Sequence, residues 1–447
     1  MRSVSELLYL KPGELGRAWP FFLFYLLLFG AFSVADGVSL ALFVKRVGAD
    51  RLPLYYAITA IANVVLIGGY VWVAERVGGQ RMFQAILGGT VAVYATAWAA
   101  LRWLDGGPAW YGALFVTREI AFTLVLMHFG TYLQDYFSRE ELNRVLPVVY
   151  AGGRVGGIAG GWLLEHLSGP LGPLNLVPVF LGLCLVCMGV LVVVSRRFRP
   201  LHAPEDEHGD PATFAPAEDR ALERQARTSL GSFVRFVWAS PLLFWMTISS
   251  VLYMVVRWFL NYQYNAFFQG YFADSRELAE FLGRYTQVAL LLSLLVQLLL
   301  VNRLVAWVGV GGAYLAYGAI VCGGALLCLL PMTLGVAIFC RLLETELRFG
   351  LRNPLMQLLS NKFSKALRVR VRAWTIGLLT PLGTLTASVL LGGLIGTGAA
   401  GWISWVGGGL GVTYLLSALG LWGVERRGEA PAQIRQAPEL VSTKEDR

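Results

Sequence analysis

The sequence predicts an all-α membrane protein with twelve transmembrane helices, and three observations support this. Hydrophobic residues make up 56% of the 447 residues and charged residues only 15%, whereas a typical soluble domain is about 25% charged. Apolar runs of about 20 residues, the length that spans a bilayer, recur along the chain. Most Lys and Arg residues fall in alternate loops between these runs. This composition excludes a water-soluble enzyme of ordinary type.

Twelve apolar runs are long enough to cross a bilayer. They lie at about 19–44, 52–73, 82–104, 110–136, 145–167, 174–194, 241–268, 281–308, 312–330, 334–355, 373–395 and 398–424. A long polar stretch rich in Pro, Ala and charge separates the first six runs from the last six. We therefore expect an N-terminal bundle at 1–195, a cytoplasmic linker at 196–235, a C-terminal bundle at 236–427 and a disordered tail at 428–447.

The Lys/Arg distribution predicts that both chain ends lie in the cytoplasm. With the N-terminus there, the loops on that side contain most of the basic residues, such as Arg139 and Arg196, and the opposite loops contain few, such as Lys45. Residues 1–17 lack the apolar core and cleavage site of a signal peptide. The sequence therefore predicts a multi-pass protein of the cell inner membrane.

The two halves are alike in matching segments. "VADGVSLALFV" of the first run aligns with "FLNYQYNAFFQ" of the seventh and places Asp36 over Asn261. "GGRVGGIAGGWLL" of the fifth run aligns with "LLTPLGTLTASVLL" of the eleventh. These matches predict two pseudo-symmetric six-helix bundles. That is the architecture of the major facilitator fold, in which the substrate site lies between the halves near the bilayer midplane.

The tenth run contains the largest group of charges inside the membrane. Arg341, Glu344, Arg348 and Arg352 are spaced i, i+3, i+7 and i+11, which places them on one face of a regular helix. Such a face lines a cavity or pairs with a neighbouring helix. The order also allows an ion pair within the helix, and a purely structural network is the alternative. We expect Arg352 to reach the polar membrane surface.

The first, fourth and seventh runs supply further charges. Arg118 and Glu119 are adjacent, about 100° apart on a helix, so we expect them to have different partners. Asp36 and Arg257 lie in equivalent helices of the two halves. The hypothesis is that they pair across the halves and close the outer mouth.

The fifth run contains six glycines in two interleaved ladders, Gly152/Gly156/Gly160 and Gly153/Gly157/Gly161. This spacing is typical of helices whose backbones approach closely, so we expect packing rather than ligand binding. Arg154 lies within this frame and is a candidate for the cavity. His128 of the fourth run is expected to be a hydrogen-bonded packing residue.

Arginines outnumber carboxylates inside the predicted spans, which favours an anionic substrate, because Arg binds carboxylate and phosphate through two hydrogen bonds. The candidate substrate-binding residues are Arg118, Arg154, Arg257, Asn261, Arg341 and Arg348. The candidate gating or coupling residues are Asp36, Glu119, Glu344, Glu75, Arg76 and Arg81. The sequence shows no catalytic constellation, metal site, cofactor motif or nucleic-acid-binding pattern. The aromatic residues near Arg257, such as Trp258, could stack on a flat ring or serve packing.

Two sets of segments resemble known families. "AERVGGQR", with Glu75, Arg76, Gly78 and Arg81, resembles a loop of major facilitator transporters that braces their cytoplasmic side. "EELNRVLPVVYAGGRVGGIAGG" and "LNYQYNAFFQGYFADSRELAEFLGRY" resemble the ADP/ATP translocase-type transporters of plastids and bacteria. The resemblance implies exchange of a nucleotide or another phosphorylated anion. The first helix departs from that family, since it keeps Asp36 but has Val38 where a lysine is expected.

The function predicted from sequence is secondary transport of an organic or phosphorylated anion by alternating access, with exchange of a nucleotide such as ATP or ADP as one form of it. The expected partners are this small anionic substrate and the lipid bilayer, and the expected state is a monomer. One alternative is proton-coupled efflux of an amphiphile or lipid, with Asp36 or Glu119 as the proton carrier. Another is a permease-like module that senses a ligand or binds a partner without transporting.

Overall fold

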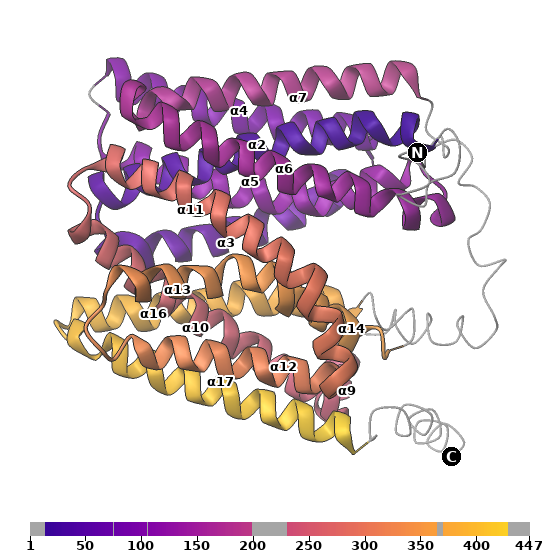
Figure 1. The fold of residues 1–447 in the computed structure, drawn as a ribbon, viewed down its shortest axis with the longest axis vertical. Helices are drawn as coiled ribbons and strands as arrows, with labels where there is room; N and C mark the ends of the chain where they lie inside the picture. The colour runs from indigo at the N-terminus through magenta and orange to yellow at the C-terminus, as the bar shows by residue number, and fades with distance from the viewer. Residues whose placement is uncertain (1–13, 75, 105, 199–229, 364–369, 428–447) are drawn as a thin grey trace. The chain divides into compact units, whose positions relative to one another are not determined.

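The computed structural model of the protein describes residues 14–74, 76–104, 106–198, 230–363 and 370–427, and the regular elements in these ranges are helices (Figure 1). The chain divides into two compact units. Unit 1 comprises Met1–Gly209 together with Phe268–Leu292, and unit 2 comprises Asp210–Phe267 and Ser293–Arg447. The expected tail and most of the expected linker lie outside the described residues.

Unit 1 is built from long helices that run back and forth. They are α2 (Glu14–Arg46), α3 (Leu52–Ala74), α4 (Gly79–Trp103), α5 (Pro108–Gln134), α6 (Arg139–Leu171), α7 (Val177–Arg197) and most of α11 (Ser275–Leu295), with short 3-10 turns η1 (Ala49–Arg51) and η2 (Pro173–Leu176). A capping box starts α6, where the Ser138 side chain accepts a bond from the backbone N–H of Glu141 and the Glu141 side chain accepts one from Ser138.

The centre of unit 1 is an aromatic cluster that fixes α2 against α4 and α5. Phe24 meets Phe83 edge to face with ring centroids 5.2 Å apart, and it stacks on Phe129 at 6.0 Å. These rings are buried among aliphatic residues of α7. In a bilayer the lipid is as apolar as the helix surface, so packing of this kind, rather than exclusion of water, holds the helices together.

The glycine ladders of α6 are packing surfaces, as predicted. A methyl group on Gly156 would overlap the carbonyl oxygen of Leu26, and one on Gly160 would overlap that of Gly30, so one ladder lies against the α2 backbone. In the second ladder Gly153 faces α2, whereas Gly157 and Gly161 face α11, where a methyl group on Gly161 would come 2.9 Å from the carbonyl oxygen of Gly283. Helix α6 therefore contacts neighbours on two sides at backbone distance.

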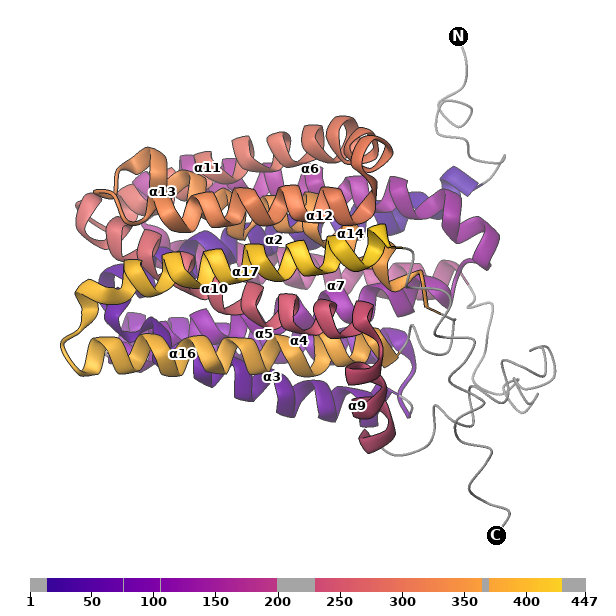
Figure 2. The same cartoon turned by 90° about the horizontal axis from the view of Figure 1, so that it is seen from below.

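Unit 2 contains shorter and more irregular helices. They are α9 (Leu230–Ala239), α10 (Pro241–Tyr271), α12 (Asn302–Leu327), α13 (Leu334–Glu344), α14 (Asn353–Ser360), α16 (Thr380–Gly396) and α17 (Ile403–Arg426). Helix α10 belongs to unit 2 as far as Phe267. The unit also contains the π-helices η4 (Val296–Val301), η5 (Arg348–Arg352) and η6 (Ala373–Leu379) and the 3-10 turn η7 (Ala400–Trp402). Helices α12 and α17 pack side by side (Figure 2).

Two of the π-helices immediately precede a proline. Pro354 stands in the first turn of α14 after η5, and Pro381 stands in the first turn of α16 after η6. Proline has no backbone N–H and its ring clashes with the carbonyl four residues earlier, so the turn before it widens. The tenth predicted span, expected as one regular helix over 334–355, is therefore broken into α13, η5 and α14.

Ten helical segments among the described residues are long and apolar enough to cross a membrane. The two predicted spans without such a helix are the fifth, α6, and the tenth. Helix α6 is rich in glycine and carries Arg154 and Glu165, which lowers its hydropathy, and α13 has only 11 residues. Twelve spans and cytoplasmic chain ends stay predictions.

Candidate functional site

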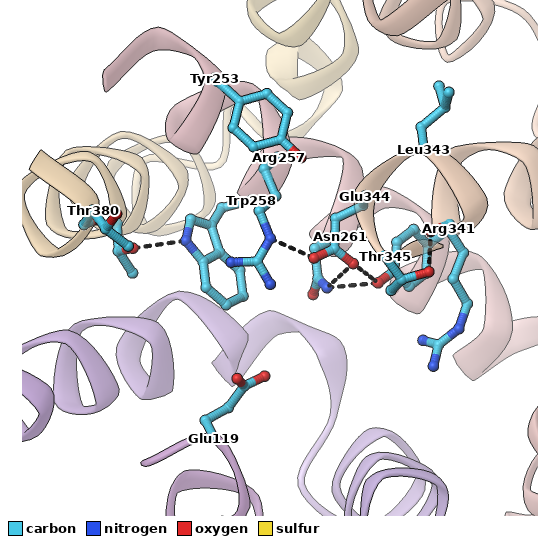
Figure 3. A network of polar contacts seen from close by, with 12 residues as sticks. Glu119, Tyr253, Arg257, Trp258, Asn261, Arg341, Leu343, Glu344, Thr345 and Thr380 are labelled. Carbon is cyan, nitrogen blue, oxygen red and sulfur yellow. Dashed lines mark hydrogen bonds and ion pairs between the residues drawn. The ribbon is translucent and has the colours of Figure 1, made fainter. Parts of the chain in front are cut away.

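The strongest concentration of polar contacts in unit 2 surrounds the carboxylate of Glu344, the last residue of α13 (Figure 3). Arg257 Nε donates a hydrogen bond to Glu344 Oε1 at 2.5 Å. The Tyr264 hydroxyl donates to Oε2 at 2.8 Å, and Asn261 Nδ2 donates to the same oxygen at 3.2 Å. Only 2% of the Glu344 side chain is exposed. A buried carboxylate with this many donors is fully satisfied.

The three donors lie on one face of α10. Arg257, Asn261 and Tyr264 are spaced i, i+4 and i+7, so a regular helix directs them toward the same neighbour. Arg257 and Asn261 are candidate residues from the sequence, whereas Tyr264 was one of the aromatic residues near Arg257 for which stacking or packing was expected. The i+7 spacing from Arg257 was the signal that could have identified it as a carboxylate ligand.

Two more guanidinium groups of the same segment act on Glu344. Arg341 is 3% exposed, and its guanidinium carbon lies 5.6 Å from the centre of the Tyr264 ring. Arg348 follows on η5, over the ring of Phe349 at 4.4 Å. Both are close enough to Glu344 for an electrostatic interaction. Three guanidinium groups therefore lie around this carboxylate.

The ion pair of Glu344 joins two helices rather than one turn of its own helix. The residue spacing allowed an ion pair within the tenth span, but in the structure Glu344 forms its ion pair with Arg257 of α10. The helix ends at Glu344, and the Thr345 hydroxyl donates to the carbonyl of Arg341 at 2.8 Å. The π-helix η5 begins four residues after Glu344, so the side chains beyond Thr345 do not keep the spacing of one regular α-helix.

Arg352 does not reach the polar membrane surface, and that prediction was wrong. Its side chain is buried, with the guanidinium carbon 3.9 Å from the centre of the Tyr253 ring. The Tyr317 hydroxyl donates to that of Tyr253 at 3.1 Å, which holds the ring in place. The aromatic face attracts the cation inside the unit, so the side chain turns inward instead of extending along the helix.

Unit 1 contains a second charge cluster, in which two carboxylates contact one guanidinium group. Arg118 of α5 forms ion pairs with Asp36 of α2 and, at 3.0 Å, with its sequence neighbour Glu119. The side chains are 14%, 29% and 20% exposed for Arg118, Asp36 and Glu119. The expectation that Arg118 and Glu119 have different partners was wrong, because two long side chains can bend together across 100° of helix surface.

The proposed pairing of Asp36 with Arg257 stays a prediction. Within its own unit each has another partner, Arg118 for Asp36 and Glu344 for Arg257. Arg154 is half-buried on α6 between the glycines that contact α2 and α11.

The loop expected to brace the cytoplasmic side joins α3 and α4. Arg76 and Arg81 are exposed there, and Glu75 lies outside the described residues. Nearby, His128 of α5 is buried as predicted for a packing residue, with Nε2 2.6 Å from the Gly79 carbonyl and Nδ1 2.9 Å from the Tyr70 hydroxyl. These bonds tie α5 to the start of α4 and the end of α3.

Trp258 of α10 contacts α16 through a hydrogen bond. It is buried, and its Nε1 donates to the Thr384 hydroxyl of α16 at 2.8 Å. The described ranges contain no group of three or more His, Cys, Asp or Glu residues able to hold a metal ion.

Solved structures of transporters superpose on this chain over nearly its whole length. The nucleoside transporter NupG, in a mutant form, matches with a TM-score of 0.63 and 12% identity over 91% of this chain and 99% of its own. An auto-inhibited POT family peptide transporter matches with 0.61 and 13% identity over 92% and 97%. A bacterial homologue of the iron transporter ferroportin matches with 0.60 and 15% identity over 91% and 99%.

The chain has the fold of these transporters. No protein-family model and no curated protein matches the sequence. The ten apolar helices and the shared fold indicate a multi-pass membrane protein.

Proposed function

We propose that the protein is a secondary transporter of the cell inner membrane that moves an organic or phosphorylated anion by alternating access. The observation that carries this proposal is that the guanidinium groups of Arg257, Arg341 and Arg348 gather around the carboxylate of Glu344. Ionisable groups inside membrane spans commonly mark a substrate pathway. Guanidinium groups bind phosphate or carboxylate in two-point fashion, so such a gathering suits an anionic substrate.

A nucleotide is the specific substrate that we propose, with ATP/ADP exchange as the form to test first. The support is the sequence resemblance to ADP/ATP translocase-type transporters, together with a fold shared with a nucleoside transporter. In this proposal Arg341 and Arg348 contact the phosphates, while Arg257 stays paired with Glu344. We further propose that Asp36, Glu119 and the α3–α4 loop residues act in gating, and that the protein works as a monomer.

Counterflow in liposomes tests the proposal. Purified protein is reconstituted with unlabelled ADP inside, and uptake of labelled ATP is measured, with inorganic phosphate and succinate as further substrates. Arg348→Gln removes a proposed phosphate contact and is expected to lower uptake at least tenfold. Arg303→Gln, an exposed arginine of the same unit, is the matched control and is expected to transport normally. Unchanged uptake by Arg348→Gln would mean that the cluster is only structural.

Proton coupling is a second candidate that a separate observation favours. In unit 1 two carboxylates, Asp36 and Glu119, share the one guanidinium of Arg118, and all three side chains have some exposure. Carboxylates inside membrane spans are candidate members of a proton relay. Uptake or efflux that responds to a pH gradient in the native protein, and loses that response in Glu119→Gln, would support coupling. Ligand binding without counterflow would favour the non-transporting alternative.

A further inference from the structure

Two recesses lie between α2 and α7 of unit 1, and neither takes part in the proposed transport site. The first is a cavity of 230 Å³ that Arg17 and Phe21 of α2 line together with Tyr136, Arg197 and Phe198. The second is a groove of 470 Å³ lined only by apolar residues. Its lining includes Trp19, Pro20 and Leu23 of α2 and Val186, Val190 and Val193 of α7.

The two recesses follow one another along one face of α7. On α7, Val186, Val190, Val193 and Arg197 are spaced i, i+4, i+7 and i+11, which is one stripe of a regular helix. On α2, Arg17 stands about one turn before Pro20. The start of α2 and the end of α7 lie at the same side of the unit (Figure 1), and the helices pack together. The basic cavity therefore closes one end of the apolar groove.

The cavity has the charge to hold an anion. Arg17 donates to Glu141 at 2.8 Å and to the carbonyl of Tyr136 at 2.7 Å, so its position is fixed and its charge is balanced. Arg197 is exposed, and no carboxylate in the described part of the chain pairs with it. Aromatic rings form the floor, with Phe21 and Tyr136 centroids 5.2 Å apart. A negatively charged group here would meet Arg197 in a partly desolvated setting.

The groove has the depth and the surface to hold a hydrocarbon chain. From Val186 to Arg197 the helix rises about 16 Å, about half of the roughly 30 Å hydrocarbon thickness of a bilayer. Trp19, Val186 and Val193 are exposed large apolar side chains. They are expected to face lipid, with Trp19 near the interface where tryptophan is favoured. The groove thus spans one leaflet and ends where a headgroup belongs.

We propose that α2 and α7 form a binding site for an anionic phospholipid. Its phosphate lies in the cavity beside Arg197 and Arg17, and one acyl chain lies in the groove beside Val190 and Val193. Basic pockets between membrane helices at the cytoplasmic side are known to hold anionic lipid headgroups. The apolar groove adds a requirement for the attached chain, so a free phosphate alone does not satisfy the site. This inference is independent of the transported substrate.

The test measures lipid binding to the purified protein in detergent by native mass spectrometry and by thermal stability. The probes are dioleoyl phosphatidylglycerol, dioleoyl phosphatidylcholine and sn-glycerol 3-phosphate. Phosphatidylglycerol has an anionic headgroup and acyl chains, and phosphatidylcholine has a headgroup without net charge and acyl chains. Glycerol 3-phosphate is an anionic headgroup without acyl chains. The protein is expected to retain and be stabilised by phosphatidylglycerol in preference to the other two.

Two pairs of variants test the head and the chain separately. Arg197→Gln is expected to weaken phosphatidylglycerol binding about fivefold, as for loss of one basic residue near a headgroup. Its control is Arg196→Gln, which is exposed but outside the cavity. Gly189→Leu fills the groove, and nothing lies within 4 Å of its added Cβ, so the fold should tolerate it. Gly182→Leu, equally open but outside the groove, is its control.

Each outcome decides the proposal. Weaker phosphatidylglycerol binding in Arg197→Gln and Gly189→Leu, with both controls unchanged, supports it. Equal binding of phosphatidylcholine and phosphatidylglycerol would overturn it, and so would equal behaviour of Arg197→Gln and Arg196→Gln. Stabilisation by glycerol phosphate as strong as that by the lipid would show a site for soluble anions instead. Transport of the proposed substrate is measured separately and does not enter this decision.

Discussion

The two units hold their membrane helices together in different ways. In unit 1, α6 packs on α2 and α11 through glycines. The charged side chains Asp36, Arg118 and Glu119 of this unit are partly exposed. In unit 2, α10 and α13 are joined by a buried carboxylate and its donors. Glycine packing tolerates little change of shape, whereas a buried ion pair tolerates little change of charge. Substitutions should therefore affect the units by different rules.

The largest effect is expected from Glu344→Ala in unit 2. Removing the carboxylate leaves Arg257 buried beside two further cations, and loss of one partner of a buried pair costs about 3–5 kcal/mol. The free energy of unfolding in detergent should fall by about that amount. The double variant Arg257→Leu/Glu344→Leu should recover part of the loss, because it removes a stranded cation. A stability of Glu344→Ala equal to that of the native protein would contradict the idea of a charge-sensitive unit.

Gly156→Ala should have the next largest effect, through shape alone. The new methyl group would overlap the backbone of Leu26, and overpacking of this kind costs about 1–3 kcal/mol. The matched control is Gly182→Ala in α7, where nothing lies within 4 Å of the added atom. That control should be neutral or slightly stabilising, because alanine favours helix. Equal losses in both variants would show that helix propensity and not close approach explains the glycines.

Arg118→Met tests how strongly the charge cluster of unit 1 depends on its cation. It leaves Asp36 and Glu119 without their shared cation, but both carboxylates are more exposed than Glu344. Their remaining hydration should limit the loss of stability to about 1 kcal/mol. Denaturation under the conditions used for Glu344→Ala measures the difference. A loss as large as that of Glu344→Ala would mean that the two clusters are equally dependent on pairing.

The smallest effect concerns the loop before α11, in unit 1 but outside the predicted spans. The pKa of Asp274 is held below its usual value by hydrogen bonds from the backbone N–H groups of Glu277 and Arg276. Because the folded pKa is depressed, its stabilisation is present above the ordinary pKa of aspartate and is lost as pH falls through the lowered value. Asp274→Ala should cost about 0.5–1 kcal/mol at neutral pH.

Asp274→Asn is the control for this prediction, since asparagine also caps a helix start but does not titrate. Thermal unfolding of the three proteins between neutral and strongly acidic pH measures the effect. The native protein should lose its advantage over Asp274→Ala on acidification, whereas the difference between Asp274→Asn and Asp274→Ala should not change. A native advantage that is independent of pH would contradict the role of the carboxylate.

Much of the helix order was predictable from sequence because apolar runs of spanning length are a strong signal. The glycine spacing also predicted close packing of the fifth run. The break in the tenth run was missed because charge spacing was interpreted on a regular helix. Pro354 was the available signal, since a proline inside a predicted helix widens or ends the turn before it.

The choice of partners in the candidate site was less predictable. Glu344 had an arginine of its own run three residues away, and only the tertiary arrangement shows that Arg257 of α10 takes that place. The same holds for Arg118, which binds both its neighbour and Asp36. Spacing along one helix identifies which residues share a face, but it does not identify which other helix approaches that face.

The assignment of Phe268–Leu292 to unit 1 has a consequence for fragment complementation. A fragment ending at residue 209 contains α2 to α7 but lacks α11, so Gly157 and Gly161 lose their neighbours Leu290 and Gly283. A fragment of residues 210–447 carries the missing helix. When the two pieces are synthesised as separate polypeptides, the first should need the second to complete its own packing. We therefore expect the two fragments, when synthesised in the same cell, to associate without a peptide bond between residues 209 and 210.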